Sequence, residues 1–297
     1  MASPTLKQLR YFDALAAQGH FGRAAELCAI SQPALSMQIR ELEEQFGTPL
    51  FERGARQVRL TRVGAELAPR VRDILRSVDE LGDIARATRG RLEGRLNVGV
   101  IPTVAPYLLP ALIGALRQSH AGLDVHVRET LTPRLIEELA DGRIDTAIVA
   151  LPVDEPTLAE VPLFTERFVL VRPAAEADAP VPGGEALAQM KLLLLEEGHC
   201  FRDQALAYCA AGASAPRDGL DGTSLSTLVQ MVGAGLGVTL IPEMAIPVEA
   251  RWPGVAVARL PSPEPARTIG MVWRRTSPLA AQFAGIAEVV RAAAEPA

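Results

Sequence analysis

The segment GHCFRDQALAYC carries the residues best suited to thiol chemistry. It places Cys200 directly after His199 and two positions before Arg202, with Cys209 nine positions further along. If residues 201–208 form a helix, Cys200 lies at its N-terminus, where the helix dipole and the two basic neighbours favour the reactive thiolate. The same pattern fits two unreactive thiols that flank an ordinary helix rich in alanine and leucine. Spacing alone leaves both interpretations open.

Metal chemistry, cofactor chemistry and a structural disulfide framework have little support. The chain has three cysteines and four histidines in 297 residues, and they are scattered. It contains no HExxH, CxxC or P-loop motif, so no metal or other cofactor is expected. The third thiol, Cys28, is expected to be a core residue of a short helix, because free cysteine is among the most buried residue types.

The elements that must position Cys200 and Cys209 alternate between strands and helices. Strand-like and helical patterns follow one another over residues 95–101, 106–118, 123–129, 132–141 and 145–151. This alternation predicts an α/β sheet. A long strand-like run over residues 161–172 leads into a second set of elements, and residues 268–274 precede a last helix.

The first sixty residues predict a compact set of helices. Ser31 is an N-cap candidate and Pro33 suits the first turn of the helix that follows. Behind the cap, four apolar residues recur every three or four positions and should pack inward: Leu35, Ile39, Leu42 and Phe46. A short helix, a brief turn and a longer helix with a polar outer face are typical of a helix-turn-helix. The start of such a recognition helix enters the major groove, which makes these residues candidates for DNA contact: Gln32, Pro33, Ser36, Met37 and Arg40.

A basic segment follows the recognition helix. Arginine recurs every third position at Arg53, Arg56, Arg59 and Arg62, a pattern that predicts a wing with phosphate contacts from Arg53 and Arg56. Residues 1–90 hold 13 basic and 11 acidic side chains, whereas the remainder holds 17 and 24. Local positive charge matters more for DNA binding than the overall pI of about 5.5, because local cations displace counterions from phosphate. A solvated surface is the plainer interpretation of such a cluster.

The next helix carries a seam that could join two chains. From Val63 onward, apolar residues recur at steps of four and three: Leu67, Val71, Ile74, Val78 and Leu81. Such a heptad pattern predicts pairing along a long helix. Residues 88–94, with glycines at both 90 and 94, then predict a hinge.

The run HFGRAAELCAISQPALSMQIRELEEQFGTPLFERGARQVRLTRVG resembles the DNA-binding domain of LysR-type transcriptional regulators, with departures at Gly22 and Met37. The resemblance implies an α/β protein with an all-α winged helix-turn-helix domain, a linker helix for dimerisation, and a two-lobed regulatory domain like that of periplasmic binding proteins. The implied boundaries are residues 1–62, 63–90 and 91–297, with lobe I formed by 91–165 plus 267–297 and lobe II by 166–266.

The motifs EGHCFRDQAL-x-x-C, IPTVAPYLLP and EPARTIG extend the resemblance to the peroxide-sensing branch of that family. It implies that Cys200 becomes a sulfenic acid and then forms a disulfide with Cys209, which a thiol reductant reverses. By motif position, the residues around the peroxide would be Thr103, Thr132, His199, Asp203 and Arg267. The implied partners are promoter DNA, RNA polymerase, hydrogen peroxide as the signal for oxidative-stress genes, and further copies of the chain in a dimer of dimers.

Two other functions stay open at this point. One is a LysR-type regulator that binds a small effector between its lobes, with incidental cysteines. The other is an enzyme, a thiol peroxidase, although the helix-turn-helix argues against it. Lys7, Arg10 and Asp13 interrupt the apolar run that a signal peptide needs, and no stretch approaches a membrane span of about 18 apolar residues. A cytosolic protein without a membrane partner is therefore expected.

Overall fold

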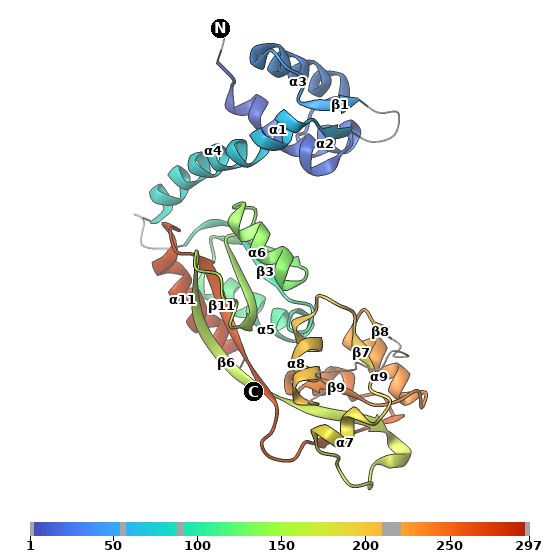
Figure 1. Cartoon of the computed structure of the whole chain (residues 1–297). Coiled ribbons are helices and arrows are strands. Elements are labelled where there is room, and N and C mark those ends of the chain that lie inside the picture. Colours follow the sequence, from blue (N-terminus) through green and yellow to red (C-terminus); the bar gives the residue numbers. More distant parts are fainter. Residues whose placement is uncertain (1–2, 54–57, 88–91, 210–220, 295–297) are drawn as a thin grey trace. The chain divides into compact units, whose positions relative to one another are not determined.

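The computed structural model describes residues 3–53, 58–87, 92–209 and 221–294. The chain divides into two compact units, Met1–Ala85 and Arg86–Ala297, and Figure 1 labels many of their elements. Arg56 and most of the expected hinge at residues 88–94 lie outside the described residues. None of the described helices combines the length and apolar character that a membrane crossing requires.

Three helices and a two-stranded hairpin form the first unit, and a long helix follows. The bounds are α1 (Leu6–Gln18), α2 (Phe21–Leu27), α3 (Gln32–Phe46), β1 (Phe51–Arg53), β2 (Val58–Leu60) and α4 (Arg62–Ala87). Ser31 caps α3, since its hydroxyl accepts a hydrogen bond from the Ala34 N–H. The strands β1 and β2 pair antiparallel, which gives the helix-turn-helix its wing.

The apolar stripe of α3 packs against α1 as expected, with one exception. Leu35, Ile39 and Leu42 are buried in the same core as Phe12. The prediction for Phe46 is wrong, because its side chain is 39% exposed. It is the last residue of α3 before the left-handed cap at Gly47, where the helix has passed beyond the core.

The long helix α4 divides its apolar residues between this core and the surface. Val71 is only 4% exposed and belongs to the core of the unit, so it is not available to a second chain. Leu67 also packs against that core. By contrast, Ile74, Leu81 and Ile84 are 47%, 65% and 52% exposed. The exposed part of the seam therefore runs through these three residues, and Val71 does not belong to it.

The second unit begins with a mixed sheet covered by helices on both faces. The bounds are β3 (Gly94–Val100), α5 (Ala105–Ser119), β4 (Leu123–Glu129), α6 (Thr132–Ala140), β5 (Thr146–Leu151), β6 (Leu158–Pro173), β11 (Ala266–Arg274) and α11 (Ala280–Ala294). Strands β3, β4 and β5 are parallel, and β11 runs antiparallel between β5 and β6.

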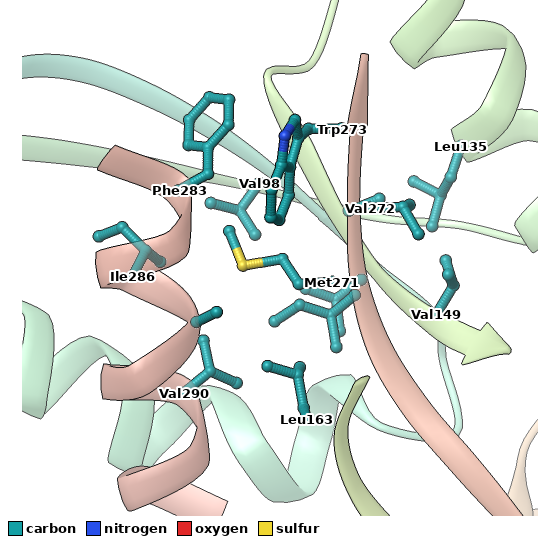
Figure 2. Close-up of a cluster of buried hydrophobic side chains, with 14 of the residues drawn as sticks. Val98, Leu135, Val149, Leu163, Met271, Val272, Trp273, Phe283, Ile286 and Val290 are labelled. Atoms are coloured by element: carbon teal, nitrogen blue, oxygen red, sulfur yellow. The ribbon is translucent and has the colours of Figure 1, made fainter. Parts of the chain in front are cut away.

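Successive side chains of β11 pack alternately on the two faces of this sheet. Figure 2 shows Met271 and Trp273 pointing toward Phe283 and Ile286 of α11, whereas Val272 points to the opposite side. All of these side chains are buried in one apolar cluster, the core of lobe I. Because side chains alternate across a strand, helices are needed on both faces.

A second apolar core forms lobe II around the other half of β6. Its elements are a 3₁₀ turn (Ala174–Glu176), α7 (Gly184–Ala188), β7 (Leu194–Leu195), α8 (Cys200–Tyr208), β8 (Asp221–Gly222), α9 (Leu225–Gly233), β9 (Thr239–Pro242), a second 3₁₀ turn (Glu243–Ala245), α10 (Ile246–Glu249) and β10 (Val255–Arg259). The long strand β6 pairs with β11 over its first part and with β9 and β10 over its last part. One continuous strand thus belongs to both cores, and the expected two-lobed architecture is confirmed.

Candidate functional site

The helix α8 forms where the sequence predicts it and carries one thiol at each end. Cys200 is its first residue and Cys209 its C-cap. Phe201 and Ala205 are buried and fix one face of α8 to lobe II, where the Phe201 ring centroid lies 4.7 Å from that of Phe168. Cys200 packs against the core of lobe I, whereas Cys209 is part of the core of lobe II. The two thiols therefore lie in different parts of the regulatory unit.

The helix holds the thiols too far apart to form a disulfide. Nine positions of an α-helix rise about 13.5 Å, whereas the two Cα atoms of a disulfide lie about 4.4–6.8 Å apart. Both Cys200 and Cys209 are free thiols in this structure. A bond between them requires α8 to unwind.

A small cavity lies beside Cys200, between the two lobes. Its volume is about 10 Å³, which is close to what one water-sized molecule needs. The residues that line it are Ile101, Pro102, Thr103, Leu131, Thr132, Gly198, His199 and Cys200. Gly198 has a left-handed φ of +93°, and a Cβ there would lie 3.0 Å from Leu131, so glycine lets the chain turn into α8 at the cavity wall.

One hydroxyl in the cavity wall is unsatisfied. The Thr132 Oγ1 atom is buried and has no hydrogen-bond partner in the described part of the chain. A buried hydroxyl without a partner costs about 1–3 kcal/mol, so such groups commonly mark a position where a ligand or water binds. Thr132 therefore offers a hydrogen bond to a small polar molecule in the cavity.

The second hydroxyl in the cavity wall, that of Thr103, is hydrogen-bonded to a buried ion pair between Arg267 and Glu166. Arg267, whose side chain is 0% exposed, donates from Nη1 to Thr103 Oγ1 at 2.8 Å and from Nη2 to the Thr103 carbonyl at 3.1 Å. It also donates from Nε to Glu166 Oε1 at 2.8 Å. Burial raises the pKa of the Glu166 carboxyl, and the adjacent Arg267 opposes that shift. The guanidinium also lies 5.1 Å from the centroid of the Phe201 ring of α8.

Of the five residues expected around a peroxide, the structure places three in the cavity wall: Thr103, Thr132 and His199. Arg267 binds Thr103 from behind and does not line the cavity. Asp203 is exposed and does not line it either. Phe201 and Ala205 turn their side of α8 to the core, and position 203 faces away from both. A role for Asp203 beside the peroxide stays a prediction.

The basic neighbours of Cys200 act differently from what their spacing predicts. Arg202 donates to the Leu195 carbonyl at 2.6 Å and to Asp221 at 2.9 Å, so its charge is engaged elsewhere. Burial lowers the pKa of His199, although Glu196 opposes the shift, and the ring is therefore neutral near pH 7. Cys200 itself is the first residue of α8, at the end of the helix that carries the partial positive charge of the helix dipole.

The remaining two thiols are in apolar surroundings. Cys209 is 1% exposed, and burial raises the pKa of its thiol, so in this state it is protonated and shielded. Cys28 caps the end of α2 and packs, half-buried, against the core of the first unit. Burial raises its pKa as well.

Sequence reasoning missed two further partners of Arg267, the carboxylate of Glu166 and the ring of Phe201. Glu166 lies directly opposite Arg267 in the register of β6 and β11. Its only sign in the sequence is a carboxylate within a strand-like run, which by itself does not reveal the partner strand.

The candidate DNA-binding residues lie along the first half of α3. Gln32, Pro33, Met37 and Arg40 are exposed and Ser36 is half-buried, while the buried face of α3 packs on the core. Arg53 ends the strand β1, and Arg56 lies outside the described residues. A polar helix face of this kind, next to a two-stranded wing, can enter a DNA groove.

Comparison with known families gives two matches that together span most of the chain. Residues 6–65 match the model of the bacterial regulatory helix-turn-helix protein, lysR family. Residues 89–295 match the model of the LysR substrate binding domain.

Similar individual proteins extend over almost the full length. The chain is 42% identical to the DNA-binding transcriptional dual regulator OxyR of Escherichia coli K12, over 97% of this chain and 95% of that protein. It is 38% identical to an H₂O₂-bound OxyR mutant from Corynebacterium glutamicum, with a TM-score of 0.67 and coverage of 98% and 93%. A full-length OxyR variant from Pseudomonas aeruginosa is 35% identical with a TM-score of 0.78, and the match covers 98% of this chain and 96% of that one.

Proposed function

The chain belongs to the LysR family of bacterial helix-turn-helix regulators, and we propose that it is a transcription regulator that senses hydrogen peroxide through a reversible disulfide between Cys200 and Cys209. The observation that carries this proposal is the cavity of about 10 Å³ between the lobes, with Cys200 in its wall. Pockets for metabolites measure about 300–1,000 Å³, so this interlobe site suits peroxide far better than a metabolic effector.

The first step is the oxidation of Cys200. The thiolate sulfur attacks one oxygen of hydrogen peroxide, so that an S–O bond forms and the O–O bond breaks. The products are a sulfenic acid and hydroxide, which takes up a proton and becomes water. Both oxygens need hydrogen-bond partners during this step, and Thr103 and Thr132 provide hydroxyls in the cavity wall.

The second step joins the two thiols. Cys209, once deprotonated, attacks the sulfur of the Cys200 sulfenic acid, and the hydroxyl group leaves as water after protonation. Because Cys209 is buried at the far end of α8, this step requires the helix to unwind. A thiol reductant then returns two electrons and restores the two free thiols.

The change in the regulatory unit is transmitted to DNA through the assembly. The exposed start of α3 contacts bases through Gln32, Pro33, Ser36, Met37 and Arg40, and the wing contacts phosphates through Arg53 and Arg56. Chains pair along α4, chiefly through the exposed side chains of Ile74, Leu81 and Ile84. The half-buried Leu67 and Val78 contribute the parts of their side chains that remain exposed. Two such pairs form a dimer of dimers. RNA polymerase is the partner at the promoter, which in a bacterium places the protein in the cytosol.

Counting free thiols after peroxide addition tests the function directly. We expect one equivalent of hydrogen peroxide to remove two thiols per chain within seconds, and a thiol reductant to restore them. Chains with Cys200→Ser should lose none rapidly, and Cys28→Ser should behave like the wild type. No fast loss in the wild type would overturn peroxide sensing, and many turnovers per chain in the presence of reductant would indicate a peroxidase instead.

A further inference from the structure

We infer that Glu166 is a positioning residue for the peroxide reaction: it holds Arg267 in place, and Arg267 in turn aims the hydroxyl proton of Thr103 into the cavity. The inference rests on the proposed function, because it assigns a role in the oxidation of Cys200. Glu166 itself does not line the cavity and acts only through Arg267.

The geometry fixes the direction of the Thr103 hydroxyl. A threonine hydroxyl has one proton to donate and two lone pairs that accept. Thr103 Oγ1 accepts a hydrogen bond from Arg267 Nη1 at 2.8 Å, so one acceptor position faces the guanidinium and the proton must point elsewhere. Thr103 is 3% exposed and lines the cavity, where the proton can be donated to a peroxide oxygen. A cationic donor on the same oxygen also polarises the hydroxyl and strengthens it as a donor.

Glu166 determines where the guanidinium lies. Its Oε1 accepts from Nε of Arg267 at 2.8 Å and lies 2.7 Å from Nη2. The two side chains are 6% and 0% exposed, so water cannot replace the carboxylate at this position. The strand register sets Glu166 directly opposite Arg267, which holds the carboxylate on a rigid element. Without it, the buried cation would lack its charge partner and would shift toward another acceptor.

The best test variant is Glu166→Gln, which keeps the size of the side chain and removes the charge. It is studied in the Cys209→Ser background, so that oxidation stops at the sulfenic acid. Two second-order rate constants of Cys200 are measured at the same pH, one with hydrogen peroxide and one with iodoacetamide. Their ratio isolates peroxide positioning, because iodoacetamide also reports thiol access and ionisation but has no peroxide oxygen to orient.

We expect Glu166→Gln to lower this ratio about tenfold, which is less than the roughly 10²–10³-fold cost of removing a preorganised donor altogether, because the Thr103 hydroxyl is still present. Thr103→Val should lower it at least as much, and Glu166→Gln added to Thr103→Val should lower it less than twofold further, because both act on one hydroxyl. Glu138→Gln is the matched control. Glu138 is also a buried carboxylate with arginine partners. Its partners are Arg128 and Arg134, not Arg267, so Glu138→Gln should leave the ratio unchanged.

The outcomes separate this inference from the proposed function. A slow peroxide reaction in the parent protein would contradict the function itself. If the parent protein reacts rapidly with peroxide but Glu166→Gln leaves the ratio of the two rate constants unchanged, only the role of Glu166 is overturned. The same holds if the losses in ratio from Glu166→Gln and Thr103→Val multiply in the double variant. If Glu166→Gln does not fold, the double variant Glu166→Leu and Arg267→Met removes the whole ion pair. Its ratio of the two rate constants should be as low as that of Thr103→Val. A ratio equal to that of the parent protein would also overturn the inference.

Discussion

At the scale of single residues, the cavity beside Cys200 combines unsatisfied hydrogen-bonding capacity with neutral surroundings. Thr132 presents a buried hydroxyl that has no partner among the described residues, and Thr103 presents one oriented by Arg267. His199 is neutral because burial lowers its pKa. Such a site binds a small uncharged molecule that can both donate and accept hydrogen bonds. Hydrogen peroxide has these properties.

Replacing Thr132 by valine should slow the reaction of Cys200 with peroxide without lowering the free energy of unfolding. The variant removes a buried hydroxyl that has no partner in the described structure, so the free energy of unfolding should stay the same or rise by up to about 1 kcal/mol. The peroxide rate constant of Cys200 should fall. Thr146→Val is the control, since the Thr146 hydroxyl is buried and donates to the Val272 carbonyl at 2.9 Å. It should lose about 1 kcal/mol of stability and keep the peroxide rate; the reverse pattern would contradict this account of Thr132.

The neutral His199 should also give stability a pH dependence. Its pKa in the folded protein lies below its ordinary value of 6.5, so between these two values the unfolded chain binds more protons. The contribution is therefore fully present above pH 6.5 and is lost as the pH falls through 6.5 toward the folded pKa. Urea unfolding over roughly pH 5 to 7.5 should show this loss in the wild type and a smaller one in His199→Gln. Parallel curves would show that His199 is not the cause.

At the scale of elements, α8 both protects and controls the second thiol. It keeps Cys209 buried and protonated, at about 13.5 Å along the helix from Cys200. Oxidation of Cys200 and formation of the disulfide are therefore separate steps with different requirements. The first needs the cavity intact, and the second needs the helix to open.

A glycine on the exposed side of α8 should speed only the second step. Ala207→Gly lowers helix stability by roughly 0.5–1 kcal/mol, which should accelerate disulfide formation about two- to fivefold and leave sulfenic acid formation unchanged. Rapid-quench mass spectrometry resolves both steps. Ala284→Gly, at an exposed position of α11, controls for a general loss of stability. Equal effects of the two variants on disulfide formation would refute the role of α8 opening.

The helix α8 and the cap of α3 could be predicted from the sequence because they depend on local signals. Ser31 and the spacing of apolar residues suffice for α3, and alternating apolar residues identify β3 and β4. Contacts between distant segments could not be predicted in this way. Arg202 pairs with Asp221 through tertiary folding, and Glu166 meets Arg267 through strand register. Neither contact leaves a periodic signal in the chain.

At the scale of the whole molecule, we expect chains to associate through the exposed apolar residues of α4. Ile74, Leu81 and Ile84 recur at steps of seven and three, which places them on one face of the helix. Three large apolar side chains on a helix face otherwise exposed to water are typical of a pairing surface.

Charges on that face should separate the chains. The double variant Ile74→Asp and Leu81→Asp would place unpaired charges in the pairing surface of α4. Sedimentation should therefore show loss of the dimer formed through α4, and the affinity for DNA should drop at least tenfold. Ala65→Asp, on the opposite side of α4 and exposed, is the control and should assemble and bind as the wild type does. If the double variant sediments and binds DNA like the wild type, the chains pair elsewhere.

Peroxide is expected to convert α8 from a helix into an unwound segment that can form the disulfide, and amide hydrogen exchange measures this change directly. Exchange of residues 200–208 is compared in the reduced protein, the peroxide-treated protein and peroxide-treated Cys209→Ser, which stops at the sulfenic acid. We predict strong protection in the reduced protein, loss of that protection after oxidation of the wild type, and retained protection in Cys209→Ser. Equal protection of α8 in the reduced and disulfide-bonded wild type would contradict the claim.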